Sequence, residues 1–272
     1  GLVLTLEDLG TQSEPPTHPA LLDWLAADFV SGQDWSLKGL IKMILMSATY
    51  RQSSTIEETK YALDPENLFY ARGPKLRLSA EEIRDQALFV SNLLSDKKYG
   101  PGVMPPQPDG IWEHAYLGNL WKESKGEDRY RRAIYTYLKR TSPYPSLISF
   151  DAGSREVCLV RRSPSNTPLQ ALVTLNDPVF LEAALNLANL NSDLPKRQAI
   201  KKMYKTAVYQ EIDDQILDLL ERLFDEAYQD FDQTPEKLQD FFNQESEVDQ
   251  KLAALAVVGN AIMNLDEFLT HG

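Results

Sequence analysis

Apolar residues recur at helical spacing near the start of the chain. Thr17 and Pro19 precede the first of these stripes, and Ser36 precedes the second after a break at Gly32. A polar cap residue and an early proline both favour a helix start. We therefore expect two helices that pair as a hairpin. Their stripes are Leu21, Trp24, Leu25 and Phe29 in the first helix, and Leu40, Ile41, Ile44 and Leu45 in the second.

Three further helix starts are marked by side chains that can cap them. Ser79 is followed three residues later by Glu82, and Thr167 by Gln170, which is the spacing of a capping box. Asp177 stands directly before a proline, so it combines a cap residue with a favoured first helical position. We expect one helix after the first capping box and two consecutive helices after the second.

The C-terminal third continues with apolar stripes at helical spacing. One stripe lies within residues 216–227, a helix start stands at Thr234, and a long apolar face covers residues 248–263. We expect the last of these helices to close a bundle. Three of its residues should be buried against helices of the first half of the chain: Leu255, Ile262 and Met263.

The middle of the chain interrupts this helical pattern. Residues 99–110 carry four prolines and three glycines, which predicts a long surface loop. Residues 132–139 alternate in polarity and residues 157–160 are apolar and β-branched, so both favour short strands. The predicted fold class is mainly α, an irregular multi-helix bundle with a small β element in the middle. We expect a single domain over 1–272, with subregions 1–100 and 165–272 around a loop and β-rich middle at 101–164.

Composition and charge disfavour some classes of binding partner for this chain. The formal net charge is −12, and the 14 acidic and 2 basic residues between Glu211 and Asp249 account for all of it. Nucleic acid is disfavoured because its phosphates bind clustered Lys and Arg. No apolar run approaches the roughly 20 residues that span a bilayer, so we expect no membrane span. The chain opens at Gly1 without a methionine, and we expect it to be a piece of a longer protein.

Motifs for catalysis or metal binding are sparse. The three histidines, His18, His114 and His271, lack the spacing of a zinc site, so no metal is predicted. The single cysteine, Cys158, lies in an apolar run, which favours a buried and inert thiol. No CxxCH motif is present, so we expect no haem or other cofactor in this chain. The catalytic residues are therefore unknown.

One polar segment stands out from this background. Its members within residues 151–170 are Asp151, Arg155, Glu156, Arg161, Arg162, Asn166 and Gln170. As a site, it would bind an anion or a sugar through arginine forks, with Asp151 or Glu156 as acid or base. As a structural network, it would fix an irregular crossing segment by ion pairs and caps. We favour the network, and expect at least one of its three arginines to be largely buried against a carboxylate. Residues 50–53, which end the second helix, allow the same two interpretations.

Five segments carry a resemblance to a known family. They are HPALLDWLAADF (18–29), SLKGLIKMILMSATYRQSS (36–54), LSAEEIRDQAL (78–88), KRTSPYPSLISFDAGSREVCLVRRSPSNTPLQALVTLNDPVFLEAA (139–184) and MNLDEFL (263–269). Together they resemble the planctomycete-type secreted domain family, domain of unknown function 1553. The family's leading helical segment, expected ahead of GLVLTLEDLG, is absent from the sequence, so an apolar surface should be exposed where that segment packs.

The resemblance implies a setting and no established activity. It implies a C-terminal domain of large exported bacterial proteins, located in the periplasm or at the cell surface, with a c-type haem domain elsewhere in the same polypeptide. Two hypotheses follow. The first is a non-catalytic interaction or scaffold module whose partners are other domains of the same polypeptide. The second is a domain or enzyme that binds an anionic or carbohydrate ligand through the segment from Asp151 to Gln170.

Overall fold

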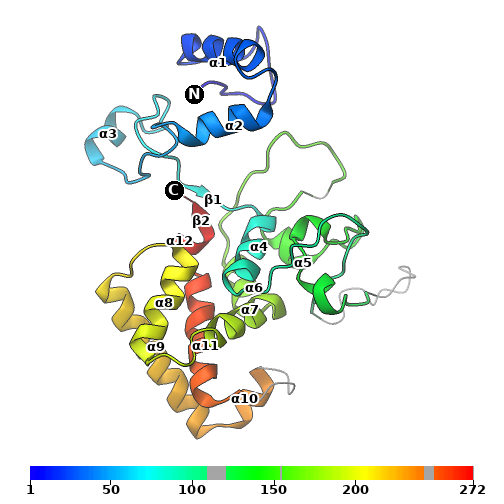
Figure 1. The fold of residues 1–272 in the computed structure, drawn as a ribbon, viewed down its shortest axis with the longest axis vertical. Coiled ribbons are helices and arrows are strands. Elements are labelled where there is room, and N and C mark those ends of the chain that lie inside the picture. Colours follow the sequence, from blue (N-terminus) through cyan, green and yellow to red (C-terminus); the bar gives the residue numbers. More distant parts are fainter. Residues whose placement is uncertain (109–120, 154, 242–247, 272) are drawn as a thin grey trace. The chain divides into compact units, whose positions relative to one another are not determined.

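A computed structural model describes residues 1–108, 121–153, 155–241 and 248–271 of the chain (Figure 1). Helices make up about 51% of it, so the prediction of a mainly helical fold is confirmed. The elements are α1 (Pro19–Ser31), α2 (Leu37–Met46), α3 (Glu58–Leu63), β1 (Leu76–Arg77), α4 (Ala80–Val90), η1 (Gly126–Tyr130), η2 (Ala133–Tyr135), α5 (Pro145–Ser149), α6 (Pro168–Asn176), α7 (Pro178–Asn189), α8 (Lys196–Val208), α9 (Asp214–Gln233), α10 (Glu236–Phe241), α11 (Gln250–Met263), α12 (Asp266–Leu269) and β2 (Thr270–His271).

The chain divides into two compact units. The first consists of residues 1–76, 159–161 and 270–272, and the second of residues 77–158 and 162–269. We call them the first unit and the second unit. A compact unit need not fold independently, so the single domain over 1–272 stays a prediction.

The hydrophobic core of the second unit is built around α11. This helix packs against α7, α8 and α9, and Figure 1 shows these helices side by side. Leu255, Ile262 and Met263 are fully buried, as expected. The helices that pack most extensively against α11 belong to the second half of the chain, while the same core also includes Ile83 and Ala87 of α4 from the first half. Small residues allow the close approach: a Cβ added at Gly259 would lie 3.2 Å from the carbonyl oxygen of Ala184 in α7.

Cap residues start the helices of the second unit where the sequence predicts them. In the capping box of α4, the Ser79 N–H donates to the Glu82 carboxylate at 2.8 Å. At α6, the Thr167 N–H donates to the Gln170 side-chain oxygen at 3.1 Å. Asp177 caps α7 by accepting from the backbone N–H two residues later, at 2.9 Å. These three contacts satisfy backbone donors that a helix start leaves unpaired.

The β element is small and lies elsewhere than expected. β1 and β2 form a two-stranded antiparallel sheet. Residues 133–135 form the 3₁₀ turn η2, and the next residue makes only an isolated bridge with Val103. Residues 157–160 are irregular and exposed, because a β-branched run forms a strand only when another strand pairs with it. Residues 109–120 of the predicted loop and β-rich middle lie outside the described residues.

In the first unit, α1 and α2 do not form the expected hairpin. Among residues 1–76, all of which the structure describes, no two helices pack closely together. An edge-to-face contact between Phe29 and Trp35, with ring centroids 5.4 Å apart, ties the end of α1 to the start of α2. The only buried residues in this range are Asp64 and Gly73. The first unit therefore lacks an apolar core of its own.

Candidate functional site

Asp151 is the centre of a hydrogen-bond network in the polar segment. It follows α5 with a left-handed backbone (φ 62°), and its carboxylate accepts from the Ser165 N–H at 2.7 Å and the Ser165 hydroxyl at 2.8 Å. The Gln170 amide, which is buried, donates to Ser165 Oγ at 3.1 Å and more weakly to Asp151 at 3.4 Å. Because these groups pair with one another, this part of the segment joins α5 to α6 and leaves Asp151 little capacity to bind a ligand.

Arg162 forms a second set of contacts with α4. Its two terminal nitrogens donate to the two Glu81 carboxylate oxygens at 2.5 and 2.8 Å. This pairing, opposed in part by burial, lowers the pKa of Glu81, and Arg155 contributes a weaker effect in the same direction. Arg155 and Arg162 line a shallow hollow of about 570 Å³ together with Ser79, Glu81 and Ile134. Two guanidinium groups thus face one hollow, although one of them already has a carboxylate partner.

The other predicted site residues do not line the hollow. Arg161 pairs with Glu7 at 3.0 Å within the first unit, and both side chains are more than half exposed. Glu156 and Asn166 are exposed as well. The structure therefore brings Arg155 and Arg162 to one hollow, places Asp151 and Gln170 in a separate network, and does not assemble all seven residues into one site.

Two predictions about burial in this segment are wrong. Arg155, Arg161 and Arg162 are paired or exposed at the surface, and none of them is largely buried. Cys158 is exposed, not buried as expected. Both errors have one cause: residues 157–160, whose apolar character was expected to draw the segment inward, lie at the surface, with Val157 68% exposed.

The buried arginines lie instead at Arg84 and Arg131. Arg84 Nη1 donates to the carbonyl of Arg131 at 2.7 Å, and its Nη2 donates to the carbonyl of Arg129 at 3.2 Å. Burial lowers the pKa of Arg84, while the nearby Tyr144 and acidic groups oppose that effect. The Arg131 guanidinium lies 3.8 Å from the ring centroid of Tyr135 and donates to backbone carbonyls. Both side chains are thus satisfied largely by carbonyl oxygens, not by a carboxylate.

A signal for Arg84 was present in the sequence. Position 84 lies on the same helix face as the buried residues Ala80, Ala87 and Leu88, at spacings of three and four. An arginine within a buried apolar stripe must find hydrogen-bond acceptors inside the fold, because an unpaired guanidinium is costly to bury.

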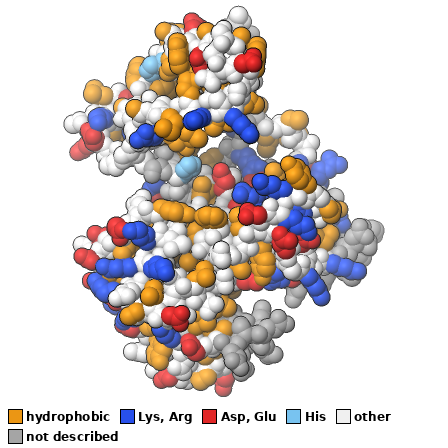
Figure 2. Space-filling model, viewed as in Figure 1, with side chains coloured by type: hydrophobic (Ala, Val, Ile, Leu, Met, Phe, Trp, Pro, Cys, Tyr) orange, Lys and Arg blue, Asp and Glu red, His pale blue; other side chains and the backbone are white. Residues whose placement is uncertain are grey.

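Hydrophobic side chains lie at the surface of the first unit. In α1, Trp24 is 54% exposed, and in α2, Ile41 is 54% exposed. Neither helix has a buried residue. Figure 2 shows hydrophobic side chains at the surface of this unit, with lysine and arginine side chains among them. Exposed apolar surface is enriched at interaction sites in soluble proteins when it forms a patch.

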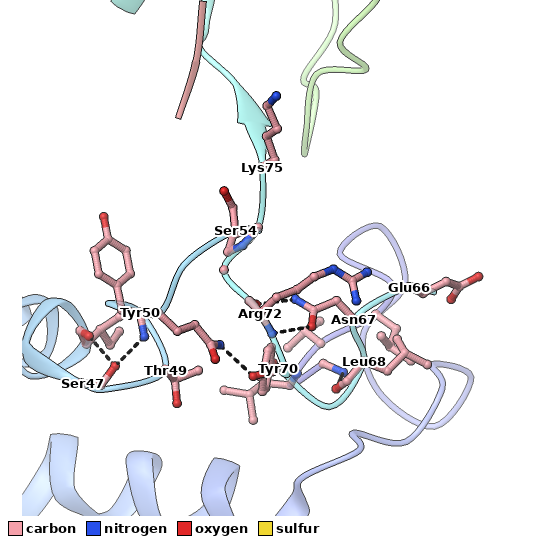
Figure 3. Close-up of a pocket in the computed structure, with 18 of the residues that line it drawn as sticks. Ser47, Thr49, Tyr50, Ser54, Glu66, Asn67, Leu68, Tyr70, Arg72 and Lys75 are labelled. Atoms are coloured by element: carbon pink, nitrogen blue, oxygen red, sulfur yellow. Dashed lines mark hydrogen bonds between the residues drawn. The ribbon is translucent and has the colours of Figure 1, made fainter. Parts of the chain in front are cut away.

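The first unit also contains a cavity of about 820 Å³, drawn in Figure 3. Tyr50 and Gln52, which follow α2, line one part of the wall, and Tyr70 lines another. The Gln52 amide donates to the backbone carbonyl of Tyr70 at 2.7 Å, which links the two parts. Sequence patterns identified residues 50–53 only as an ambiguous polar cluster. Tyr70 reaches residues 50–53 only through the fold, so no local sequence pattern identifies it as part of the cavity wall.

The histidines do not form a metal site in the described residues. His18 stacks on the ring of Tyr70, His271 lies in β2, and His114 lies outside the described residues. Among the residues that the structure describes, no group of three His, Cys, Asp or Glu side chains is placed to hold a metal ion. Nor, in the same residues, is any helix both long and apolar enough to cross a membrane.

The fold and these contacts define a mainly helical chain with a packed second unit and an apolar, incompletely buried first unit. The family described as PSD1, protein of unknown function (DUF1553), matches residues 1–224. That match covers most of the chain, so the chain belongs to this family, and the resemblance inferred from the sequence is confirmed. No curated protein matches the chain, and no solved structure does.

Proposed function

We propose that this chain is a non-catalytic interaction module that binds other domains of the same polypeptide through the exposed apolar faces of α1 and α2. The observation that carries the proposal is the burial pattern of residues 1–76, in which only Asp64 and Gly73 are buried. A stretch of this length normally buries large apolar side chains in its own core. The exposed faces of α1 and α2 therefore favour a partner that covers them.

The energy available from such a partner is substantial. Burying an isoleucine or leucine side chain contributes about 1.5 to 3 kcal/mol, and an aromatic side chain contributes a larger area. Trp24 and Ile41 are each about half exposed, so a partner could still cover roughly half of each side chain. Residues 36–56 also carry Lys38, Lys42 and Arg51 with no acidic residue, which favours a partner with acidic groups beside its apolar surface.

The proposal is tested by expressing this chain and the remaining domains of its full-length protein as separate polypeptides and measuring their association by calorimetry. Trp24→Ser and Ile41→Ser should each weaken binding by about tenfold or more, since 1.4 kcal/mol corresponds to a factor of ten. Leu219→Ser in α9 is the matched control, because Leu219 is 57% exposed but lies in the second unit. Equal binding by all three variants, or no association at all, would contradict the proposal.

A second candidate function is the binding of an anionic ligand at the hollow lined by Arg155 and Arg162. It is supported by the two guanidinium groups there, which suit a carboxylate, sulfate or phosphate. In that case Arg155→Ala should keep the thermal stability of the wild type and lose affinity for sulfate or phosphate in a titration. Unchanged anion affinity in Arg155→Ala would remove this candidate.

The cellular location and domain context that we propose rest on the family resemblance. We place the module in an exported bacterial protein, in the periplasm or at the cell surface, with no cofactor in this chain and any c-type haem in another domain. Fractionation of the native host, followed by detection with an antibody against this chain, tests the location.

A further inference from the structure

We propose that the cavity of the first unit binds a neutral carbohydrate of one or two sugar units. This inference goes beyond the interaction function and does not depend on it, because it concerns an open pocket whose lining, apart from Ile44 of α2, lies outside α1 and α2 and does not include Trp24 or Ile41. The cavity volume of about 820 Å³ lies within the range of roughly 300 to 1,000 Å³ that is usual for small-molecule sites.

The wall of the cavity combines apolar side chains with hydroxyl groups. Ile44 and Ile56 contribute apolar surface, and Thr49, Tyr50 and Ser54 contribute hydroxyls (Figure 3). Within the part of the chain that the structure describes, these three hydroxyls make no hydrogen bond to protein, although all three line the cavity. A sugar matches this mixture, since it presents C–H groups on one side and hydroxyls around its edge. A purely apolar ligand would cover the hydroxyls and leave them unpaired, which is unfavourable.

Tyr70 gives the cavity a fixed aromatic side chain. Its backbone is left-handed (φ 57°), a conformation that costs a non-glycine residue about 1 to 2 kcal/mol. Three contacts hold it: the His18 ring stacks on Tyr70 at 5.3 Å, the Tyr70 hydroxyl accepts from the Leu2 N–H at 2.7 Å, and the Gln52 amide donates to its carbonyl. Strained residues that their surroundings hold in this way are concentrated at ligand sites. A rigid ring also loses little conformational entropy when a ligand packs on it.

The charged groups of the wall favour a neutral ligand over an anionic one. The Arg72 guanidinium already donates to the carbonyls of Asp64 at 3.0 Å and Pro65 at 2.6 Å, and it lies over the ring of Tyr61. The other cations of the wall are also engaged: the Gly1 ammonium donates to Thr17 Oγ1 at 2.9 Å and to the Leu68 carbonyl at 3.0 Å, and Lys75 interacts with a neighbouring group. Glu66 adds a carboxylate to the lining. An anionic sugar would meet this carboxylate and would have to compete for cations that are already engaged.

The test is a titration of the whole 272-residue chain with neutral disaccharides of different linkage, namely maltose, cellobiose, lactose and mannobiose, by calorimetry and by NMR. At least one of them should bind saturably and perturb the Tyr50 and Tyr70 signals. Tyr50→Ala should weaken binding by about tenfold, which corresponds to 1.4 kcal/mol. Thr49→Val keeps the shape of its side chain, removes one hydroxyl, and should also weaken binding even if Tyr50→Ala fails to fold. Tyr209→Ala is the control, since Tyr209 is an exposed tyrosine of the second unit.

Three results would overturn the proposal. The first is the absence of saturable binding of every disaccharide at millimolar concentration. The second is tighter binding of galacturonic acid than of galactose, which would show that the site selects an anion. The third is unchanged affinity in both Tyr50→Ala and Thr49→Val. None of these results bears on the association measured with Trp24→Ser and Ile41→Ser, so the two proposals fail independently.

Discussion

Arg84→Ala should be among the most destabilising single substitutions in the second unit. Arg84 is 3% exposed in α4, and its guanidinium donates to the backbone carbonyls of Arg131 at 2.7 Å and Arg129 at 3.2 Å. These bonds fix the irregular segment around η1 against a regular helix. Alanine removes both donors and leaves two carbonyl oxygens without their partner, that of Arg131 in a buried environment and that of Arg129 in a part-buried one.

The expected cost is about 2 to 4 kcal/mol. A hydrogen bond from a charged donor contributes about 1.5 to 3 kcal/mol, and a buried carbonyl left unpaired costs a comparable amount. Part of this loss is offset, because removing Arg84 also removes the cost of burying a cation. The offset applies to Arg84 because its buried Nε has no hydrogen-bond partner among the described residues, so the cost of burying this cation is only partly compensated.

Urea denaturation followed by circular dichroism measures the change in the free energy of unfolding. Arg162→Ala is the comparison, because its partner is a carboxylate and its side chain is 37% exposed. A surface pair of this kind contributes about 0.2 to 1 kcal/mol. Arg84→Lys should recover only part of the loss, because one ammonium group cannot reproduce the planar fork that reaches two separate carbonyls.

The reasoning is refuted if Arg84→Ala costs less than Arg162→Ala, or if Arg84→Lys is as stable as the wild type. The first result would mean that the surface pair in the polar segment, and not the buried guanidinium, holds the irregular middle of the chain in place. The second would mean that charge alone is sufficient and that the two-carbonyl geometry contributes nothing.

Three further predictions concern the second unit. Burial raises the pKa of the Asp177 carboxyl above 3.8, so the folded chain holds this proton more tightly than the unfolded chain. The stabilisation that comes from the protonated Asp177 carboxyl is complete below pH 3.8 and is lost as the pH rises through the raised pKa. In thermal melting, Asp177→Asn should therefore show a smaller loss of stability over this pH range. Cys158 should react with a thiol reagent in the native chain, and a requirement for denaturant would show that it is buried. Gly259→Val should cost about 1 to 3 kcal/mol in urea denaturation, because an added Cβ already lies 3.1 Å from Met203 and 3.2 Å from Ala184.

Helix starts were predictable from the sequence because their determinants are local. A capping box needs only two side chains three residues apart, and both predicted boxes form, at Ser79 with Glu82 and at Thr167 with Gln170. The apolar face of α11 was equally predictable, since every third or fourth residue repeats the pattern. The helices that pack on α11 were not, because they are chosen by long-range packing that the pattern of one helix does not encode.

The candidate site was less predictable, because residues that are close in sequence make contacts with different parts of the fold. Arg161 and Arg162 are neighbours in the chain, yet one pairs with Glu7 and the other with Glu81. A dense run of charged residues therefore indicates that ion pairs will form, without indicating which ones. The exposed residues at 157–160 illustrate the same limit for apolar runs, whose burial depends on whether another element covers them.

The contrast between α2 and α11 leads from the fold to the proposed function. Both helices are rich in large apolar residues, yet α11 has nine buried residues and α2 has none. Hydrophobicity alone therefore does not explain the difference; what differs is that α7, α8 and α9 cover α11, whereas no helix of residues 1–76 packs closely against α2. Leaving such a face in water is unfavourable by roughly 25 cal/mol for each Å² of apolar area that a partner could cover. If the interaction proposal is correct, α2 should become more protected from hydrogen exchange once the remaining domains of the polypeptide are added. Unchanged exchange in α2 in the presence of those domains would mean that its exposed face has another role.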